Sequence, residues 1–156
     1  MAAHKLSIGI LDEIDFRLIA IHTSVEDYFL AYLINKNLPI LLAKDTAVSG
    51  NGDFRDANFS KFTYVDETTE TSYCLIQNKI QVQSAPKISA TDLFQMDTPS
   101  IAYLLPEFKT VDYILKVDNG EDETDNFLKL LHQIDQIATV YEINTDQIKS
   151  KNNLIF

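Results

Sequence analysis

IAYLLPEFKTVDYILKV, at residues 101–117, contains two apolar runs typical of β-strands, 101–105 and 111–117, with five residues between them. β-Hairpins commonly use connections of this length. Along 111–117 the side chains alternate between two faces, because consecutive residues of a strand point to opposite sides of a sheet. The stretch therefore predicts an antiparallel hairpin, with Asp112 and Lys116 close together on one face.

Strand-like runs recur along the rest of the chain. They combine β-branched or aromatic residues with alternating polarity, and they are bounded by turn residues. The further strands that we predict are 13–21, 40–43, 59–65, 71–76 and a short edge strand at 141–143. The third and fourth of these are joined by an acidic turn, so we expect them to form an antiparallel hairpin.

Two segments have helical character. A helix over about 24–37 follows Thr23 and Ser24, and Glu26 lies three residues after Thr23, as in a capping box. A second helix over about 122–139 places most of its apolar residues on one face. These elements predict an α+β fold, in which the two helices pack on a mostly antiparallel sheet of about five to six strands.

The remaining segments are expected to connect these elements within one domain. A chain of 156 residues that is 46% hydrophobic can bury one sizeable core, which favours a single domain over 1–156. The segment 44–58 contains Gly50 and Gly52, and we predict that it is a mobile loop. The segment 80–98 mixes Ser, Pro and Asp with scattered apolar residues, which indicates an irregular connection with a short helix near 90–95.

Charge and composition indicate which kinds of molecule the chain is expected to bind and where in the cell it is expected to lie. Asp and Glu number 23 against 13 Lys and Arg, which gives a formal net charge of −10 that repels nucleic acid and anionic membranes. The longest apolar runs fall short of the roughly 20 residues that a membrane-spanning helix needs. Cys74 is the one cysteine, so an internal disulfide is excluded. No secretion signal is apparent, and we expect a cytoplasmic protein.

The nine residues from Leu105 to Tyr113 also resemble a family signature. They match Ile-Pro-Glu-x-x-x-Val-Asp-Tyr, the pattern of the IPExxxVDY family of uncharacterised bacterial proteins, with Leu105 in place of Ile. The segments at 16–22, 26–28 and 149–156 are similar to that family as well. The resemblance implies no particular reaction, because the family is known by its sequence pattern.

Few residues of the sequence have a spacing that is typical of a catalytic site. Glu107 and Asp112 could divide acid and base roles if they were held in unlike environments, and His22 could line a pocket with Asp112 or Tyr113. A structural role is the stronger expectation, since carboxylates near turns commonly accept backbone hydrogen bonds. We therefore assign no catalytic residue.

Metal and cofactor sites are not predicted either. The acidic stretch 118–125 places Gly120 too early for a calcium loop, and acids at the start of a helix are explained by the helix dipole. No glycine-rich loop of the phosphate-binding kind is present. We expect Cys74 to be a small buried residue of a strand.

The most consistent hypothesis is a non-catalytic protein–protein interaction or assembly module of unknown partner, and a homo-oligomer is possible. The candidate contact residues are His22, Pro106, Glu107, Asp112, Tyr113 and Phe156. For the final Leu-Ile-Phe, we weigh a plug of the core against a docking tail. The alternative is a small-ligand-binding protein or enzyme with a pocket lined by the 105–113 residues. A second alternative is an RNA-associated accessory protein, although the net charge disfavours nucleic acid.

Overall fold

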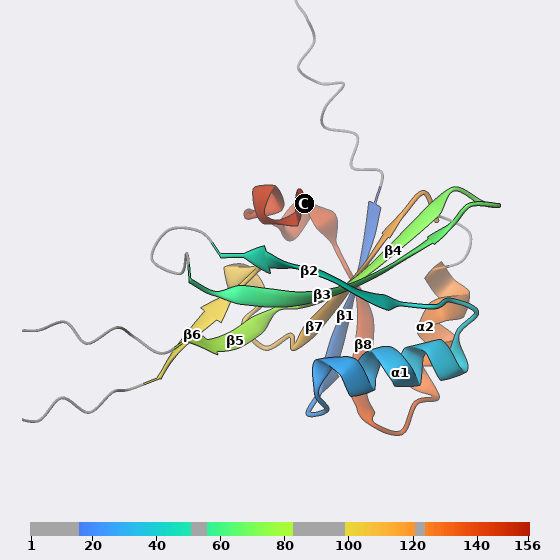
Figure 1. The fold of residues 1–156 in the computed structure, drawn as a ribbon, viewed down its shortest axis with the longest axis horizontal. Coiled ribbons are helices and arrows are strands. Elements are labelled where there is room, and N and C mark those ends of the chain that lie inside the picture. Colours follow the sequence, from blue (N-terminus) through green and yellow to red (C-terminus); the bar gives the residue numbers. More distant parts are fainter. Residues whose placement is uncertain (1–15, 51–55, 83–98, 121–123) are drawn as a thin grey trace, which may run out of the picture.

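The computed structural model describes residues 16–50, 56–82, 99–120 and 124–156 (Figure 1). In this part of the chain, six strands form the main sheet and two form a small second sheet. The main sheet contains β1 (Phe16–Thr23), β2 (Ala43–Ser49), β3 (Asn58–Asp66), β4 (Thr71–Gln77), β7 (Tyr113–Asp118) and β8 (Ile137–Ile143). The small sheet pairs β5 (Lys79–Val82) with β6 (Ser100–Tyr103). The helices are α1 (Asp27–Asn37), α2 (Thr124–His132) and the 3₁₀ turns η3 (Pro106–Phe108), η4 (Thr145–Gln147) and η5 (Lys151–Leu154).

The main sheet is antiparallel throughout, in the order β2-β3-β4-β7-β1-β8. Strand β7 lies near the middle, where Leu115 is paired with Leu75 of β4 on one side and with Ile19 of β1 on the other. The strands at the two ends of the sheet run in clearly different directions (Figure 1), because strand twist accumulates across a sheet. The predicted α+β class is confirmed, and so is the β3–β4 hairpin.

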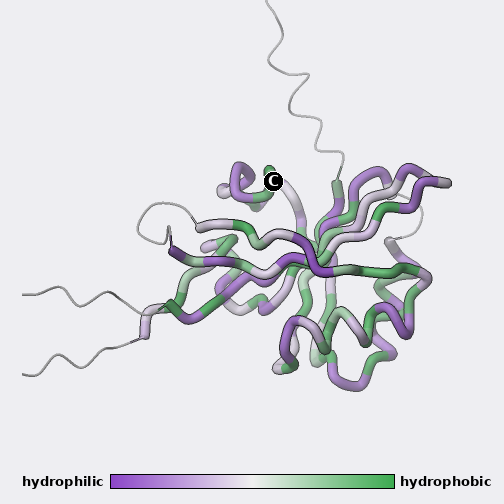
Figure 2. The backbone as a smooth tube through the Cα atoms, in the orientation of Figure 1, coloured by the Kyte–Doolittle hydropathy of each residue, from purple (hydrophilic) through white to green (hydrophobic). Residues whose placement is uncertain are grey.

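Two apolar cores lie on opposite faces of this sheet. On the first face, α1 and α2 cover residues that include Ile21, Tyr73 and Leu115. On the second face, the 104–111 segment and the residues that follow β8 cover alternate positions of the same strands, such as Ala20 and Ile114. Both faces of the central strands are therefore apolar. In Figure 2, hydrophobic (green) and hydrophilic (purple) stretches both occur along the strands and along α1.

The first helix begins later than predicted. Its N-cap is Glu26, whose side chain makes no capping bond, so the predicted capping box from Thr23 is wrong. The Thr23 hydroxyl instead donates to the Gln136 carbonyl oxygen at 2.7 Å, because a bulge in the pairing of β1 with β8 brings the two together. The helix ends at Asn37, before Leu38 and Pro39, as expected.

The predicted hairpin of 101–117 is wrong. Its first run, β6, pairs with β5 in the small sheet, and its second run, β7, enters the main sheet between β4 and β1. Between them the chain turns through η3, in which the Phe108 N–H donates to the Leu105 carbonyl oxygen. The apolar pattern of a run predicts a strand, but it does not identify the strand with which that run pairs.

The loop predicted at 44–58 and the strand predicted at 40–43 are also corrected. Residues 43–49 form β2 and Asn58 begins β3, while Ile40 and Leu42 are buried outside any strand. As an edge strand, β2 is mostly exposed and polar, so it lacks the apolar alternation of a covered strand. Similarly, part of the irregular connection predicted at 80–98 is strand β5; residues 51–55 and 83–98, including the short helix expected near 90–95, lie outside the described residues.

The second helix is shorter than predicted. It ends at His132, and 137–143 form the edge strand β8, of which only 141–143 had been expected. Buried residues continue at Ile134 and Ile137 on the first core, so the apolar spacing that suggests a longer helix in fact continues through a turn into a strand. Among the described residues, no helix has the length and apolar character required to cross a membrane.

We expect Phe127→Ala to reduce the free energy of unfolding by about 3–5 kcal/mol, the range for removing a large buried aromatic. Phe127 is 2% exposed on α2 and its ring lies 5.3 Å from that of Tyr73 on β4, so its loss opens a cavity between helix and sheet. Urea unfolding measures the change. The control is Leu41→Ala, 70% exposed, for which we expect a change within about 0.5 kcal/mol. Equal losses of unfolding free energy in the two variants would contradict the burial of Phe127 between α2 and the sheet.

Candidate functional site

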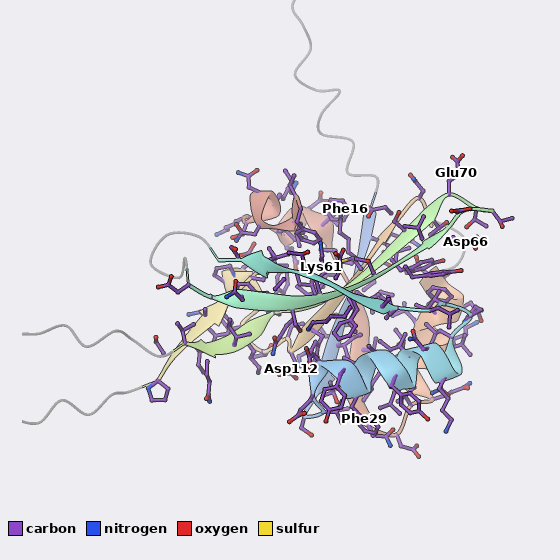
Figure 3. All side chains as sticks on the ribbon, in the orientation of Figure 1. Phe16, Phe29, Lys61, Asp66, Glu70 and Asp112 are labelled. Atoms are coloured by element: carbon purple, nitrogen blue, oxygen red, sulfur yellow. The ribbon has the colours of Figure 1, made fainter. Side chains whose placement is uncertain are left out.

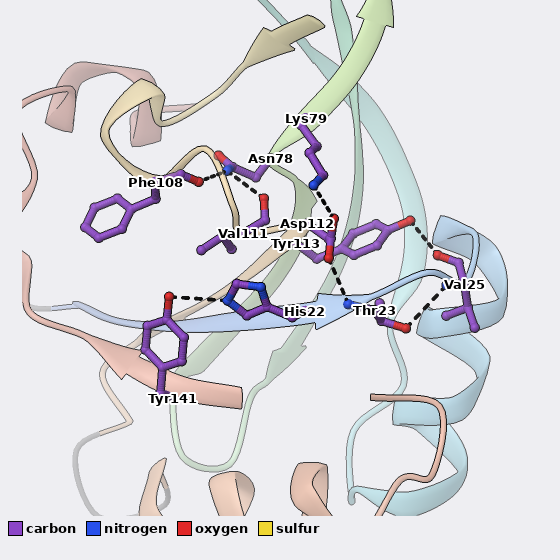
Figure 4. A network of polar contacts seen from close by, with 10 residues as sticks. All are labelled: His22, Thr23, Val25, Asn78, Lys79, Phe108, Val111, Asp112, Tyr113 and Tyr141. Carbon is purple, nitrogen blue, oxygen red and sulfur yellow. Dashed lines mark hydrogen bonds and ion pairs between the residues drawn. The ribbon is translucent and has the colours of Figure 1, made fainter. Parts of the chain in front are cut away.

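The signature segment, residues 105–113, lies at the junction of the two sheets and the C-terminal residues. Pro106 is the first residue of η3, a position where its missing N–H costs nothing. Val111 is fully buried in the second core, and Leu105 is buried beside it. Whether this segment presents a site depends on the polar side chains around it (Figure 4).

Asn78 is the centre of this junction. Its side chain is fully buried; its Nδ2 donates to the carbonyl oxygens of Phe108 and Val111, both at 2.9 Å. Its Oδ1 accepts the Leu105 N–H at 2.9 Å. Its own backbone N–H donates to the Asp112 carbonyl oxygen, and its carbonyl oxygen accepts the Leu104 N–H. One buried amide therefore satisfies a chain turn whose peptide groups would otherwise be unpaired away from water.

Asp112 and Tyr113 hold the segment to the start of α1. The Asp112 Oδ2 accepts the Thr23 N–H at 2.9 Å, and its Oδ1 lies 2.7 Å from the Lys79 Nζ. The Tyr113 hydroxyl donates to the Val25 carbonyl oxygen at 3.0 Å. Burial, with the negative charges of nearby carboxylates, raises the pKa of Tyr113 to about 12, so this hydroxyl is a hydrogen-bond donor at neutral pH. The predicted proximity of Asp112 to Lys116 is wrong: Lys116 pairs with Asp118 instead.

Glu107 ties the segment to the residues after β8. Its Oε1 accepts the backbone N–H groups of Lys149 and Ser150 at 2.7 and 2.8 Å, and its Oε2 is 3.0 Å from the Ser150 hydroxyl. Burial alone would raise the pKa of this carboxyl, but the hydrogen bonds it accepts outweigh burial and lower the pKa. Glu107 therefore stays ionised at neutral pH and acts as a clamp on a distant backbone segment.

The remaining candidate residues lie elsewhere on the second face. The His22 Nε2 is 3.3 Å from the Tyr141 hydroxyl on the neighbouring strand β8. The Phe156 ring lies under the ammonium groups of Lys61 and Lys116, at 5.2 and 5.6 Å from its centroid. Of the C-terminal Leu-Ile-Phe, Leu154 is buried in the second core, as a core plug requires, whereas Ile155 is 79% exposed. Docking of this tail on another chain stays a prediction.

A hollow of about 310 Å³ opens beside Asp112, between the start of α1 and the end of β4. Its lining includes Glu26, Asp27, Lys79, Asp112 and Tyr113, but neither His22 nor Glu107. The two aspartates already have cationic partners, since Lys44 Nζ lies 3.1 Å from Asp27. The four residues expected to line one pocket are therefore divided: Asp112 and Tyr113 meet there, while His22 and Glu107 serve other contacts.

Chemistry elsewhere among the described residues is limited. Cys74 is 7% exposed on the second face. Burial raises the pKa of its thiol to about 12, although the charges of Lys61 and Lys116 act in the opposite direction. The thiol therefore stays protonated at neutral pH and is a poor nucleophile. Across the described ranges, no group of three or more His, Cys, Asp or Glu side chains is placed to hold a metal ion.

No family model matches this chain, and comparisons with curated proteins and with solved structures found no match either. The resemblance of 105–113 to the IPExxxVDY signature therefore stays a prediction. In the structure, Glu107, Asp112 and Tyr113 of this pattern bind distant parts of the chain, and Val111 is buried in the second core.

Two residues of this junction were missed at the level of sequence. Asn78 and Lys79 lie between two strand-like runs, where a polar residue is typical of an ordinary connection. One feature of the sequence hints at a special role for Asn78: strand β4 ends just before it and strand β5 begins just after it, which leaves little room for a loop. Its partners are 26 to 34 residues away in the sequence, and no local pattern identifies them.

We expect Asn78→Ala to cost at least about 3 kcal/mol of unfolding free energy or to prevent folding, because three buried backbone groups lose their partner at about 1–3 kcal/mol each. Chemical unfolding followed by far-UV circular dichroism measures this. Asn58→Ala is the matched control, since the exposed Asn58 amide makes only a long bond of 3.4 Å to the Asp56 carbonyl oxygen. A stable, fully folded Asn78→Ala variant would contradict the proposed role of the amide.

We expect Glu107→Ala to cost about 1–2 kcal/mol at neutral pH, the lower part of the range for hydrogen bonds to a charged group, since Glu107 is half-buried. Because the pKa of Glu107 is lowered in the folded chain, its contribution is complete above the unfolded pKa of about 4.3 and is lost as pH falls through the folded value. The unfolding free energies of wild type and variant should therefore converge in acid. A difference that does not change with pH would contradict the clamp.

Proposed function

We propose that this chain is a cytoplasmic, non-catalytic protein–protein interaction module of the IPExxxVDY family, with the outer face of α1 as its contact surface. The observation that carries the proposal is an aromatic stripe, defined as Tyr28, Phe29 and Tyr32, which are 64%, 38% and 56% exposed. Figure 3 shows Phe29 on the side of α1 that faces away from the sheet. Aromatic residues contribute large contact area at low entropic cost, and they are enriched at interfaces.

The contact surface differs from the one expected at 105–113. Glu107, Asp112 and Tyr113 each hold a distant backbone group, so their polar atoms are largely engaged within the chain. A side chain whose polar atoms are bonded within the chain stabilises the fold, and few of its donors or acceptors remain for a partner protein. The contacts of the stripe on α1 among the described residues are instead local: Phe29 and Tyr32 stack on each other, with ring centroids 6.1 Å apart.

The same contacts weigh against the alternative of a small enzyme or ligand-binding protein. The carboxylates of Asp27 and Asp112 in the hollow are paired with Lys44 and Lys79, and general acid–base catalysis requires a group free to exchange its proton with substrate. The net charge of −10 weighs against an RNA-associated role. A single buried cysteine is consistent with a reducing compartment.

We expect the double change Tyr28→Ser and Tyr32→Ser to weaken partner binding by about 2 kcal/mol or more, roughly 30-fold in Kd, because exposed aromatics are frequent hot spots. Full-length tagged chain is used to capture partners from the cytosol of its own organism, and mass spectrometry quantifies them. A stoichiometric protein should be recovered with wild type and lost with the variant.

Val65→Ser is the matched control, because Val65 is an apolar side chain of β3 with a similar exposure of 57%. This variant should recover the same protein as wild type. Both variants change exposed side chains, so their circular dichroism spectra and unfolding midpoints should stay near those of wild type. Equal recovery with wild type, the α1 variant and the control would contradict the proposal.

A further inference from the structure

Helix α1 has apolar residues on two faces rather than one. Its inner face buries Leu30, Ala31, Leu33 and Ile34 against the sheet. Its outer face carries Tyr28, Tyr32 and Lys36, which are exposed and spaced at four-residue intervals. Residues four apart lie above one another on a helix, so these three side chains form one row, with Phe29 beside it. A row of this kind on a surface helix is a contact surface of defined geometry.

Opposite charges lie at the two ends of this row. The anionic end is Glu26, whose carboxylate interacts with the Tyr28 hydroxyl and raises the pKa of that hydroxyl. The cationic end is Lys36, four residues after Tyr32, just as Tyr28 lies four residues before it. No charged residue lies between Tyr28 and Asn35, and Asp27 is already paired with Lys44. The face is therefore complementary to a copy of itself turned end for end.

We infer that the outer face of α1 binds the same face of a second copy of this chain, with the two helices antiparallel and Tyr32 on the two-fold axis. This inference rests on the proposed function and names the partner. In this register each Lys36 lies against Tyr28 of the other copy, beside Glu26. The ammonium then meets both an aromatic ring and a carboxylate, and the two Tyr32 rings meet at the centre.

The antiparallel direction follows from the charges. A parallel pair would place Lys36 against Lys36 and Glu26 against Glu26, and like charges in contact are unfavourable. In the antiparallel pair, Lys36 and Tyr28 lie about 6 Å from the axis on opposite sides, given a rise of 1.5 Å per residue. The contact between Lys36 and Tyr28 then occurs twice and the contact between the two Tyr32 rings once, on the axis, as an isologous interface requires.

The net charge sets the strength of this association. Two copies of charge −10 repel each other, although salt at physiological concentration screens charges more than about 8 Å apart. A single helix row buries less area than a standard interface, which indicates a weak or transient dimer. The expected dimer is thus concentration-dependent, and it is populated most where the chain is locally concentrated.

Paired charge changes test the register. Lys36→Glu alone places carboxylates against Glu26 of the other copy, and Glu26→Lys alone places ammonium groups against Lys36. Each variant should be monomeric by sedimentation velocity at concentrations where wild type self-associates. An equimolar mixture of the two should form a heterodimer, because every contact then joins opposite charges. Loss of self-association in each variant together with recovery in the mixture is specific to the antiparallel register.

Further variants complete the experiment. Tyr32→Ser, at the axis, should raise the dimer Kd by about tenfold or more, and Val65→Ser should leave it unchanged. The inference is overturned if full-length wild type is monomeric up to millimolar concentration, or if Tyr32→Ser associates as wild type does. A monomeric wild type whose α1 variant still loses a captured partner overturns self-association alone. Capture that is insensitive to α1 changes overturns the proposed function.

Discussion

The buried side-chain amide of Asn78 is the interaction on which the arrangement of the second face depends. At this residue the chain leaves the main sheet at the end of β4 and enters the small sheet at β5, so its peptide groups must find partners outside both ladders. The amide supplies two donors and one acceptor to the 105–111 backbone, in a place that water does not reach. An apolar residue of similar size would fill the space but leave three polar groups unsatisfied.

Residues of the signature segment, 105–113, connect this buried junction to two other parts of the chain. Asp112 and Tyr113 bind backbone groups near the start of α1, and Glu107 binds backbone groups beyond β8. A short stretch therefore joins both ends of the described chain to the central strand β7. Such a stretch is constrained by folding, whether or not it also contacts another molecule. A sequence motif can define a fold in this way without defining a reaction.

The outer face of α1 is a surface that the rest of the fold leaves uncovered. Most carboxylates with a fixed geometry in this part of the chain serve an internal cation or backbone N–H, as with Asp45 beside Lys61 and Asp27 beside Lys44. The outer row of α1 has no such role. Leu30, Ala31, Leu33 and Ile34 form the buried face of α1, so packing in the core does not explain the exposed aromatic residues on its outer face.

Local sequence patterns predict the fold class, the helix that ends at Asn37, the β3–β4 hairpin and the strand character of 111–117, because hydrophobic periodicity and turn residues are local signals. For the final Leu-Ile-Phe these patterns leave a core plug and a docking tail open, and it is the structure that places Leu154 in the second core. Contacts in the folded chain are needed to show that the runs 101–105 and 111–117 contribute to different sheets, that 43–49 form an edge strand and that 137–143 are not helix. Strand pairing depends on contacts between residues far apart in the sequence, and exposed edges lack the pattern that reveals covered strands. The role of Asn78 belongs to this second group, since a buried amide is recognised by its partners and not by its neighbours in the chain.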